Sequence, residues 1–314
     1  MSEPKVGFAA KGIAYFDGRF VPMEEAKISI ATHAFNYGTG CFEGIRGYWN
    51  AERQEVYLVK LEPHFRRMTS SMRLLRIDVG LGVQDLCNVA AELVRRNGYR
   101  EDVYVRPIAY KSTPVIKVGL LHLDDAFCCF TAPMGAYLPI DRGLSVTVSS
   151  WRRNDDNAIP SRAKITGAYI NAALAVADAQ DAGFDEAIML TGEGHLSEAS
   201  AANIFLVMDG RLVTPEVTDD ILVGITRSAI MELAGKLRMP VVERRVDRTE
   251  LFVADEVFLC GTGVQVAPVT VVDGRVVGDG KMGEVTRSIQ DLYLAAVHGE
   301  VDEFMGWLTP AFGR

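Results

Sequence analysis

Lys164 is the residue whose surroundings best suit an amine nucleophile. It lies in the segment Ala158–Asn171, which contains mostly small and uncharged side chains, and no acidic residue occurs between Asp156 and Asp178. A lysine with no carboxylate nearby can lose solvation, and this loss lowers its pKa toward that of a neutral amine. A solvated surface lysine gives the same pattern, so the segment alone leaves both interpretations open.

Two other segments could bind an anion through backbone N–H groups. Leu222–Arg227 begins a predicted helix, where the amides of Gly224, Ile225 and Thr226 and the Thr226 hydroxyl could face an anion. Cys260–Val264 follows a predicted strand and could form a second anion-binding turn. An ordinary helix start and an ordinary tight turn also explain these two segments.

Arg67 and Glu198 are charged residues that could contribute to such a site. Arg67 lies about 200° around its predicted helix from Phe65, so it points away from the apolar face. Glu198 is the one carboxylate in the segment Leu196–Asn203 and could hold a cationic ring nitrogen. A solvated arginine and a turn-capping carboxylate explain these two residues equally well.

Motifs of other enzyme classes receive little support. Gly278–Gly283 fits the GxGxxG pattern, but it follows an Asp-Gly hairpin and no dinucleotide-binding unit is completed after it, so we interpret it as a loop. The patterns GxSxG, HExxH and GxxxxGK[ST] are absent. An NAD-dependent oxidoreductase, which only the Gly278–Gly283 segment supports, and a non-catalytic anion-binding module are the rival interpretations.

The composition is that of a globular protein. The chain has 314 residues, 48% hydrophobic and 24% charged, and its 33 basic and 41 acidic residues give a formal net charge of −8. This charge, without a basic stripe, disfavours nucleic acid as a partner. No apolar run reaches the roughly 18–20 residues of a membrane helix, and Met1–Pro4 lacks the pattern of a signal peptide, so we expect a cytoplasmic protein with no membrane partner.

The cysteines favour free buried thiols over a disulfide framework or a zinc site. They are odd in number and form no CxxC pair. They are Cys41, Cys87, Cys128, Cys129 and Cys260. We therefore expect no metal site.

Hairpins with intervening helices predict an α+β fold. Asp-Gly-Arg occurs at Asp17–Arg19, Asp209–Arg211 and Asp273–Arg275, and Asp-Gly favours two-residue hairpins because both turn positions adopt a positive φ. The expected strands include Val56–Val59, Val103–Tyr110, Ala126–Thr131, Leu144–Ser150, Glu186–Leu190, Asn203–Met208, Leu212–Thr214 and Glu256–Cys260. Expected helices contain Phe65 to Leu75 and Leu86 to Val94, the latter ending at Gly98, and cover Ala168–Ala182, Ile225–Arg238 and Glu284–Val297.

The segment 132–143 is the expected domain boundary. It contains two Pro and two Gly between strand-like runs, and a chain of this length favours two domains. We expect a small N-terminal domain over 1–131, an interdomain loop over 132–143 and a large domain over 144–314.

A set of short motifs extends over most of the chain, from about Ile13 to Trp307. In chain order they are His33–Gly38, Phe42–Arg46, Tyr104–Pro107, Gly135–Tyr137, Ile159–Lys164, Leu196–Glu198, Gly224–Arg227 and Gly261–Gly263. Together they resemble the branched-chain aminotransferases, which are fold-type IV enzymes dependent on pyridoxal phosphate. The resemblance implies a fold like that of D-amino acid aminotransferase, with a small N-terminal α/β domain and a larger domain built on a mostly antiparallel, barrel-like sheet.

The resemblance also implies residues that bind the cofactor. Lys164 matches the lysine that binds pyridoxal phosphate covalently and then moves the proton between the substrate Cα and C4′. Glu198 matches the carboxylate that faces the pyridine nitrogen and keeps it protonated. The remaining implied cofactor residues are Tyr169 at O3′, Leu222 against the ring, and Arg67, Ile225, Thr226 and Thr262 at the phosphate.

Substrate-binding residues follow from the same resemblance. They are Tyr37, Phe42, Gly44, Tyr104, Arg106, Tyr137 and Gly263. Tyr104 and Arg106 alternate on a strand and so share a face, where branched side chains contact aromatic rings and the glutamate side-chain carboxylate reaches the guanidinium. The α-carboxylate of the substrate is expected on the amides of Thr262 and Gly263.

Three departures from the family pattern bear on specificity. Met134 stands where many bacterial members have tryptophan, and Gly263-Val264 replaces the common Ala-Ala. The segment Lys111–His122 also matches poorly, and in relatives this loop reaches across a dimer interface. A roomier or differently shaped pocket is therefore expected.

The predicted reaction is the transfer of the amino group of L-leucine, L-isoleucine or L-valine to 2-oxoglutarate in ping-pong half-reactions. Its small-molecule partners are amino acids and 2-oxo acids, and the resemblance implies a homodimer or a higher homo-oligomer. Within the same fold, the alternatives are an aminotransferase for D-amino acids or (R)-amines and an aminodeoxychorismate lyase.

Overall fold

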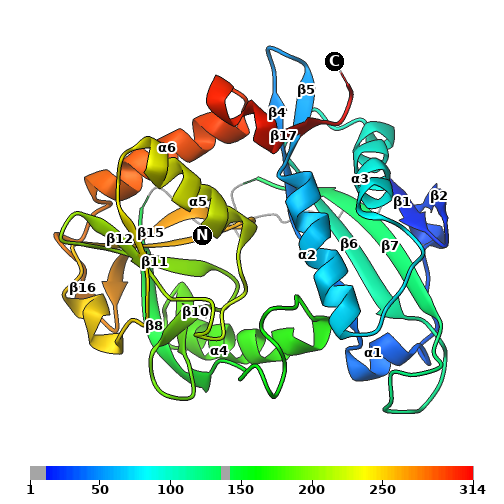
Figure 1. Cartoon of the computed structure of the whole chain (residues 1–314), viewed down its shortest axis with the longest axis horizontal. Coiled ribbons are helices and arrows are strands. Elements are labelled where there is room, and N and C mark those ends of the chain that lie inside the picture. The colour runs from blue at the N-terminus through cyan, green and yellow to red at the C-terminus, as the bar shows by residue number, and fades with distance from the viewer. Residues whose placement is uncertain (1–11, 136–141, 314) are drawn as a thin grey trace. The chain divides into compact units, whose positions relative to one another are not determined.

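Two compact units make up the computed structural model, which describes residues 12–135 and 142–313 (Figure 1). Among the described residues, the first unit contains 12–135, 163–167 and 295–313, and the second contains 142–162 and 168–294. Each unit has its own sheet. The two sheets and their helices confirm the predicted α+β class, whereas the domain ranges expected from the sequence stay a prediction.

The sheet of the first unit pairs its described strands in antiparallel fashion, in the order β17-β5-β4-β6-β7-β1-β2, with β3 paired to β6. The strands are β1 (Ile13–Phe16), β2 (Arg19–Pro22), β3 (Gly40–Phe42), β4 (Ile45–Asn50), β5 (Glu55–Val59), β6 (Val103–Lys111), β7 (Asp125–Pro133) and β17 (Leu308–Pro310). Along β6, Val103 and Val105 are fully buried, whereas Tyr104 and Arg106 are half-buried. This alternation places the Tyr104 and Arg106 side chains on one face, as predicted.

Helices of the first unit cover its sheet. They are α1 (His33–Tyr37), α2 (Leu61–Leu74) and α3 (Val83–Asn97). Helix α2 buries Phe65 and Met68, and α3 buries Leu86 and Leu93, because these residues recur at helical spacing. Helix α3 packs against α2 and against β1, β6 and β7 (Figure 1). Gly98 ends α3 with a left-handed φ of 66°, which confirms the predicted cap.

The sheet of the second unit has the order β10-β9-β8-β15-β14-β11-β12-β13, with β16 paired to β15. Its strands are β8 (Leu144–Arg152), β9 (Glu186–Leu190), β10 (Leu196–Ala199), β11 (Asn203–Met208), β12 (Arg211–Thr214), β13 (Val241–Glu243), β14 (Glu256–Gly261), β15 (Gln265–Val272) and β16 (Arg275–Val276). Most neighbours are antiparallel, but β8 is parallel to both β9 and β15, and β12 is parallel to β13. The sequence-based strands lie inside or coincide with strands of the structure.

Helices of the second unit match the predicted ranges within two residues at each end. They are α4 (Tyr169–Asp181), α5 (Ile225–Lys236) and most of α6 (Glu284–Val297), which follows the last strand of this sheet in the chain and whose last three residues belong to the first unit. Helix α4 packs on β8 and β9, and α5 packs on β14. Short 3-10 helices cover Met23–Glu25, Thr166–Ala168, Arg248–Phe252 and Asp302–Trp307.

All of the Asp-Gly-Arg segments form the predicted hairpins. The flanking residues pair directly, as Phe16 with Arg19 and Met208 with Arg211. The turn residues have left-handed dihedrals, with φ of 50° at Asp209 and 70° at Gly210. This positive φ is why glycine is favoured at the second position.

The cysteines are free thiols, and four of the five are buried. Burial, with a smaller contribution from the Glu43 charge, raises the pKa of Cys41 to about 12, so this thiol stays protonated near neutral pH.

Within residues 12–135 and 142–313, none of the helices combines the length and the apolar character required to cross a bilayer.

A pair of glycine substitutions tests this account of the hairpins. An added Cβ would contact nothing within 4 Å at Gly210 or at Gly235 in α5, so neither substitution creates a steric clash. Gly210→Ala should lower the free energy of unfolding by about 1 kcal/mol because alanine resists the left-handed conformation. Gly235→Ala, the matched control, should raise it by about 0.5 kcal/mol through helix propensity. Denaturant titration measures both changes in the free energy of unfolding. Two changes of the same sign would contradict the turn assignment.

Candidate active site

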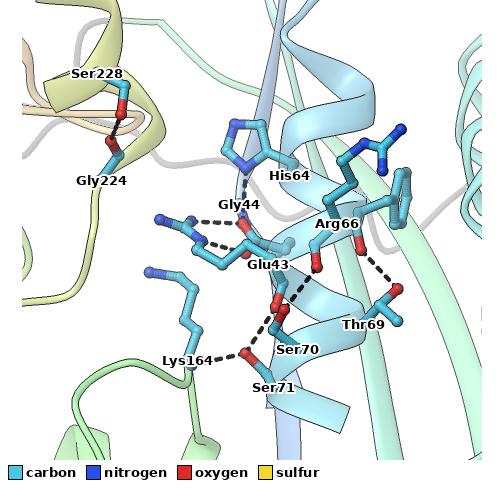
Figure 2. A network of polar contacts seen from close by, with 12 residues as sticks. Glu43, Gly44, His64, Arg66, Thr69, Ser70, Ser71, Lys164, Gly224 and Ser228 are labelled. Carbon is cyan, nitrogen blue, oxygen red and sulfur yellow. Dashed lines mark hydrogen bonds and ion pairs between the residues drawn. The ribbon is translucent and has the colours of Figure 1, made fainter. Parts of the chain in front are cut away.

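Lys164 is fixed in the first unit through its backbone. Its N–H donates to Ser71 Oγ at 3.1 Å (Figure 2), and its carbonyl accepts the Phe42 N–H at 3.0 Å. The Ser71 hydroxyl in turn donates to the Arg67 carbonyl at 3.1 Å. The Lys164 Nζ lies 5.1 Å from the centroid of the Phe42 ring. Lys164 is thus a half-buried amine beside an aromatic wall, and not a solvated surface lysine.

Arg67 extends from α2 and forms a two-pronged ion pair with Glu43. Its Nε donates to Glu43 Oε1 at 2.7 Å, and its Nη2 donates to Glu43 Oε2 at 2.8 Å. The Arg67 side chain is only 12% exposed. Arg67 does point away from the apolar face of its helix, but the alternative of a solvated arginine is wrong, because Glu43 draws the guanidinium into the protein.

Glu43 is a buried carboxylate between β3 and β4, with no exposed side-chain surface. Its Oε2 lies 2.7 Å from His64 Nδ1 and 3.3 Å from the Gly44 backbone N (Figure 2). Burial alone would raise the pKa of Glu43, but the Arg67 guanidinium and the His64 contact hold it well below its usual range. Burial lowers the pKa of His64, and the nearby Arg67 and Lys164 charges lower it further against the opposing effect of Glu43.

Tyr104 and Arg106 contact each other on their shared face of β6. Arg106 Nη2 donates to the Tyr104 hydroxyl at 2.8 Å, and the guanidinium lies 4.5 Å from the centroid of the Phe42 ring. An added Cβ at Gly44 would lie 2.2 Å from the same hydroxyl, so a larger residue there would force the Tyr104 ring to move. The structure therefore brings together four of the predicted substrate residues: Phe42, Gly44, Tyr104 and Arg106.

The structure describes one of the two other substrate residues predicted in the N-terminal half. Tyr37, at the end of α1, is 38% exposed, and its ring lies 4.8 Å from that of His33. Tyr137 lies outside the described residues. Met134, one of the departures from the family pattern, is held through its carbonyl, which accepts from Arg46 Nη2 at 3.0 Å.

Glu198 is a buried carboxylate of the second unit and lies on β10. Its Oε1 pairs with Arg153 Nη2 at 2.5 Å. Its Oε2 accepts from Asn203 Nδ2 at 2.9 Å and from the Leu222 N–H at 3.2 Å. The Leu222 contact is a turn-capping bond, so the structure shows capping together with an ion pair. Such a donor set stabilises the carboxylate anion that a cationic ring nitrogen requires.

The turn before α5 packs tightly on Asn203. The Leu222 carbonyl accepts from Asn203 Nδ2 at 3.0 Å, and an added Cβ at Gly224 would lie 2.0 Å from Asn203 Oδ1. Helix α5 begins at Ile225, and the N–H groups of a first helical turn have no partner within the helix. The Ser228 hydroxyl donates to the Gly224 carbonyl at 3.1 Å (Figure 2). The amides of Ile225 and Thr226 therefore lie in a first turn that suits an anion.

Thr262 and Gly263 form the turn between β14 and β15, where Gly261 pairs with Gln265. Gln265 has a left-handed φ of 57°, which closes this three-residue connection. Tyr169 is the first residue of α4 and is half-buried. The roles expected for these three residues stay predictions.

Several residues that shape the site were not singled out from the sequence, namely Glu43, His64, Ser71, Arg153 and Asn203. Most of them act through a partner far away in the chain, as Arg153 does with Glu198. Glu43 lies within a quoted motif, next to the glycine that Tyr104 requires. A charged residue directly beside this glycine was the available signal, but spacing alone does not identify its partner.

The Gly278–Gly283 loop is not a dinucleotide site. It joins the β15–β16 hairpin to α6, as predicted. The Glu256 carboxylate accepts the Val285 N–H at 3.0 Å and the Thr286 N–H at 2.8 Å, so the protein's own anion caps the first turn of α6. Across the described residues, no group of three or more His, Cys, Asp or Glu side chains could hold a metal ion.

Comparisons with known proteins agree with these features. The family model described as amino-transferase class IV matches residues 40–272. A probable branched-chain-amino-acid aminotransferase of Aquifex aeolicus (strain VF5) is 43% identical over 302 residues, covering 96% of this chain and 97% of that protein.

Solved structures give the same result. The branched-chain aminotransferase of Thermoproteus uzoniensis, crystallised with norvaline, superposes with a TM-score of 0.92 at 40% identity and covers 96% of this chain and 99% of that one. The T.th. branched-chain amino acid aminotransferase, complexed with N-(5'-phosphopyridoxyl)-L-glutamate, gives a TM-score of 0.91 at 38% identity with the same coverage. These matches confirm the predicted resemblance and fold-type IV class. The chain belongs to the class IV aminotransferase family, to which its motifs pointed.

Proposed function

We propose that this protein is a pyridoxal phosphate-dependent aminotransferase that transfers the amino group of L-leucine, L-isoleucine or L-valine to 2-oxoglutarate. The observation that carries the proposal is Lys164, a half-buried amine beside the Phe42 ring, in a chain 43% identical to a probable branched-chain-amino-acid aminotransferase. Norvaline and a phosphopyridoxyl glutamate bind to structurally similar enzymes, and both are consistent with these substrates.

Each unit carries groups that suit part of a phosphorylated, cationic heterocycle. In the first unit, Lys164 would bind the cofactor covalently and Arg67 would pair with its phosphate. In the second unit, Glu198 would bind the ring nitrogen and Tyr169 would donate to O3′. Leu222 would pack on the ring, and Ile225, Thr226 and Thr262 would bind the phosphate. When bound, the cofactor supplies a carbon that accepts the substrate amine and a conjugated ring that takes up electrons from Cα.

The remaining chemistry belongs to side chains of this protein. Once the substrate amine has displaced it from the cofactor, the freed Lys164 amine would move the proton between the substrate Cα and C4′ of the cofactor. The ion pair with Arg153 keeps Glu198 anionic, so Glu198 holds a proton on the ring nitrogen without taking it away.

Substrate recognition combines an apolar wall with a cation. Tyr104, Phe42 and Gly44 contact branched side chains, and Arg106 pairs with the side-chain carboxylate of glutamate or 2-oxoglutarate. One buried atom of this group, Arg106 Nε, has no hydrogen-bond partner among the described residues, so the guanidinium retains donor capacity. The family resemblance also assigns Tyr37 and Tyr137 to substrate binding, and it assigns the amides of Thr262 and Gly263 to the α-carboxylate. We do not propose the D-amino acid alternative, because the matched relatives are named for branched-chain substrates.

We also propose a cytoplasmic homodimer. Large apolar side chains are exposed in the first unit, including Ile30 at 83%, Phe35 at 68% and Ile116 at 89%. The bridge between Thr32 and Pro114 joins the two segments that carry them, and a second copy would remove this apolar surface from water. Free buried thiols are typical of a reducing compartment.

The Lys164→Ala variant tests the proposed chemistry. Removing the amine should lower turnover with L-leucine and 2-oxoglutarate by about a thousandfold or more, because the covalent attachment and the proton transfer are lost together. Lys281→Ala, which alters an exposed loop lysine, should leave turnover unchanged. A folded Lys164→Ala variant with wild-type turnover would falsify the mechanism.

Arg106→Met tests the dual pocket. The KM for 2-oxoglutarate should rise by about 10- to 100-fold, because a charge-assisted contact is lost. The half-reaction with L-leucine should change by less than about threefold. Steady-state and single-turnover kinetics separate the two effects, with the exposed Arg100→Met as control. An equal loss with both substrates would contradict the role given to Arg106.

A further inference from the structure

Glu43 is a fully buried charge that the reaction described above does not use. We propose that Glu43 is a positioning residue that holds the Arg67 guanidinium in the orientation required to bind the phosphate of pyridoxal phosphate. The inference deepens the proposed function and rests on it.

The Arg67–Glu43 contact fixes the plane of the guanidinium. Two N–H groups along one edge, Nε and Nη2, bond to the two oxygens of a single carboxylate at 2.7 and 2.8 Å. Such a two-pronged pair restricts rotation about the last bonds of a long side chain. An arginine held in this way binds a second anion without first losing rotamer freedom, which otherwise weakens binding.

Glu43 is itself anchored from three directions. Its backbone N–H donates to the Pro107 carbonyl on β6 at 3.0 Å. Its Oε2 lies within hydrogen-bond distance of His64 Nδ1 and of the Gly44 N–H, at 2.7 and 3.3 Å. With no exposed side-chain surface, the carboxylate has no route to an alternative position in water. The anchor therefore belongs to the rigid sheet, and its geometry is passed to Arg67 on the facing helix.

The same contact could act in the opposite sense, since Glu43 and a phosphate are both anions that attract Arg67. If Glu43 competed with the phosphate, it would have to withdraw when the cofactor binds. The bonds to Gly44 and His64 and the complete burial argue against withdrawal. The two roles predict opposite signs: loss of a positioning residue weakens phosphate binding, and loss of a competitor strengthens it.

The test compares pyridoxal phosphate with pyridoxal, which lacks the phosphate. Dissociation constants of both are measured on the apoprotein by absorbance titration. The ratio of the two constants reports phosphate recognition, because both compounds use Lys164 and Glu198 in the same way. Glu43→Gln should weaken pyridoxal phosphate binding by about tenfold or more and change pyridoxal binding by less than about twofold. An Arg67→Met variant should reduce the preference for pyridoxal phosphate over pyridoxal at least as much as Glu43→Gln does.

Two further variants test the positioning role of Glu43. Glu43→Asp keeps the charge but withdraws the carboxylate by one methylene. It should fold even if Glu43→Gln does not, and its preference for pyridoxal phosphate over pyridoxal should lie between those of the wild type and Glu43→Gln. Glu55→Gln is the matched control, because Glu55 is equally buried in the same unit and binds the Val56 and Phe312 N–H groups. It should leave the ratio unchanged.

The outcomes separate the inference from the proposed function. An unchanged ratio in folded Glu43→Gln and Glu43→Asp proteins, or equal weakening of both ligands, would overturn the positioning role while the function stands. Tighter pyridoxal phosphate binding would show that Glu43 is a competitor. A wild-type protein that binds neither compound would contradict the proposed function itself.

Discussion

A carboxylate taken out of water must meet a cation or several hydrogen-bond donors, and this requirement organises the functional side chains in each unit. In the first unit, Glu43 is fully buried and pairs with Arg67. In the second, Glu198 is buried and pairs with Arg153. Leaving either carboxylate without its partner would cost several kcal/mol. The charged groups are therefore fixed by the folding of the units that contain them.

The strands and turns determine where these pairs form. Glu43 follows β3 and is bonded through its backbone to β6, the strand that also carries Tyr104 and Arg106. Glu198 lies on β10, and Asn203 at the start of β11 links it to the turn that leads into α5. In both units, functional groups stand on or beside strands whose registers are fixed by neighbours. Strands set side-chain direction closely, which suits sites where a small displacement weakens a charge-assisted contact.

Much of this arrangement could be predicted from the sequence, because it depends on local chemistry. The Asp-Gly turns, the alternation of Tyr104 with Arg106 and the glycine end of α3 each follow from a few neighbouring residues. The pairing of Arg67 with Glu43 could not be predicted from spacing, since it joins a helix to a strand end 24 residues away. The surroundings of Glu198 involve Arg153, Asn203 and Leu222, which lie on three segments of the chain. Burial of a charge depends on tertiary contacts, and sequence patterns describe these poorly.

At Lys164, the sequence pattern and the structure are both needed to interpret the residue. Its uncharged segment alone is a weak indication of a nucleophile, because most lysines are solvated surface residues. The half-buried position beside the Phe42 ring argues against a solvated surface lysine, and the proposed function gives the amine its chemistry. Met134 and Gly263 depart from the common family pattern, and neither belongs to the buried ion pairs, so we expect substrate preference to vary without disturbing these pairs.

The most direct test of the central claim is the visible absorption spectrum of the pyridoxal phosphate-saturated protein before and after adding L-leucine. Parallel samples receive D-alanine and an (R)-arylamine. The account predicts a yellow protein whose visible band is lost with L-leucine and retained with the other two compounds. A band lost only with D-alanine or the (R)-arylamine would contradict the substrate assignment, and a protein that never becomes yellow would contradict the role of Lys164.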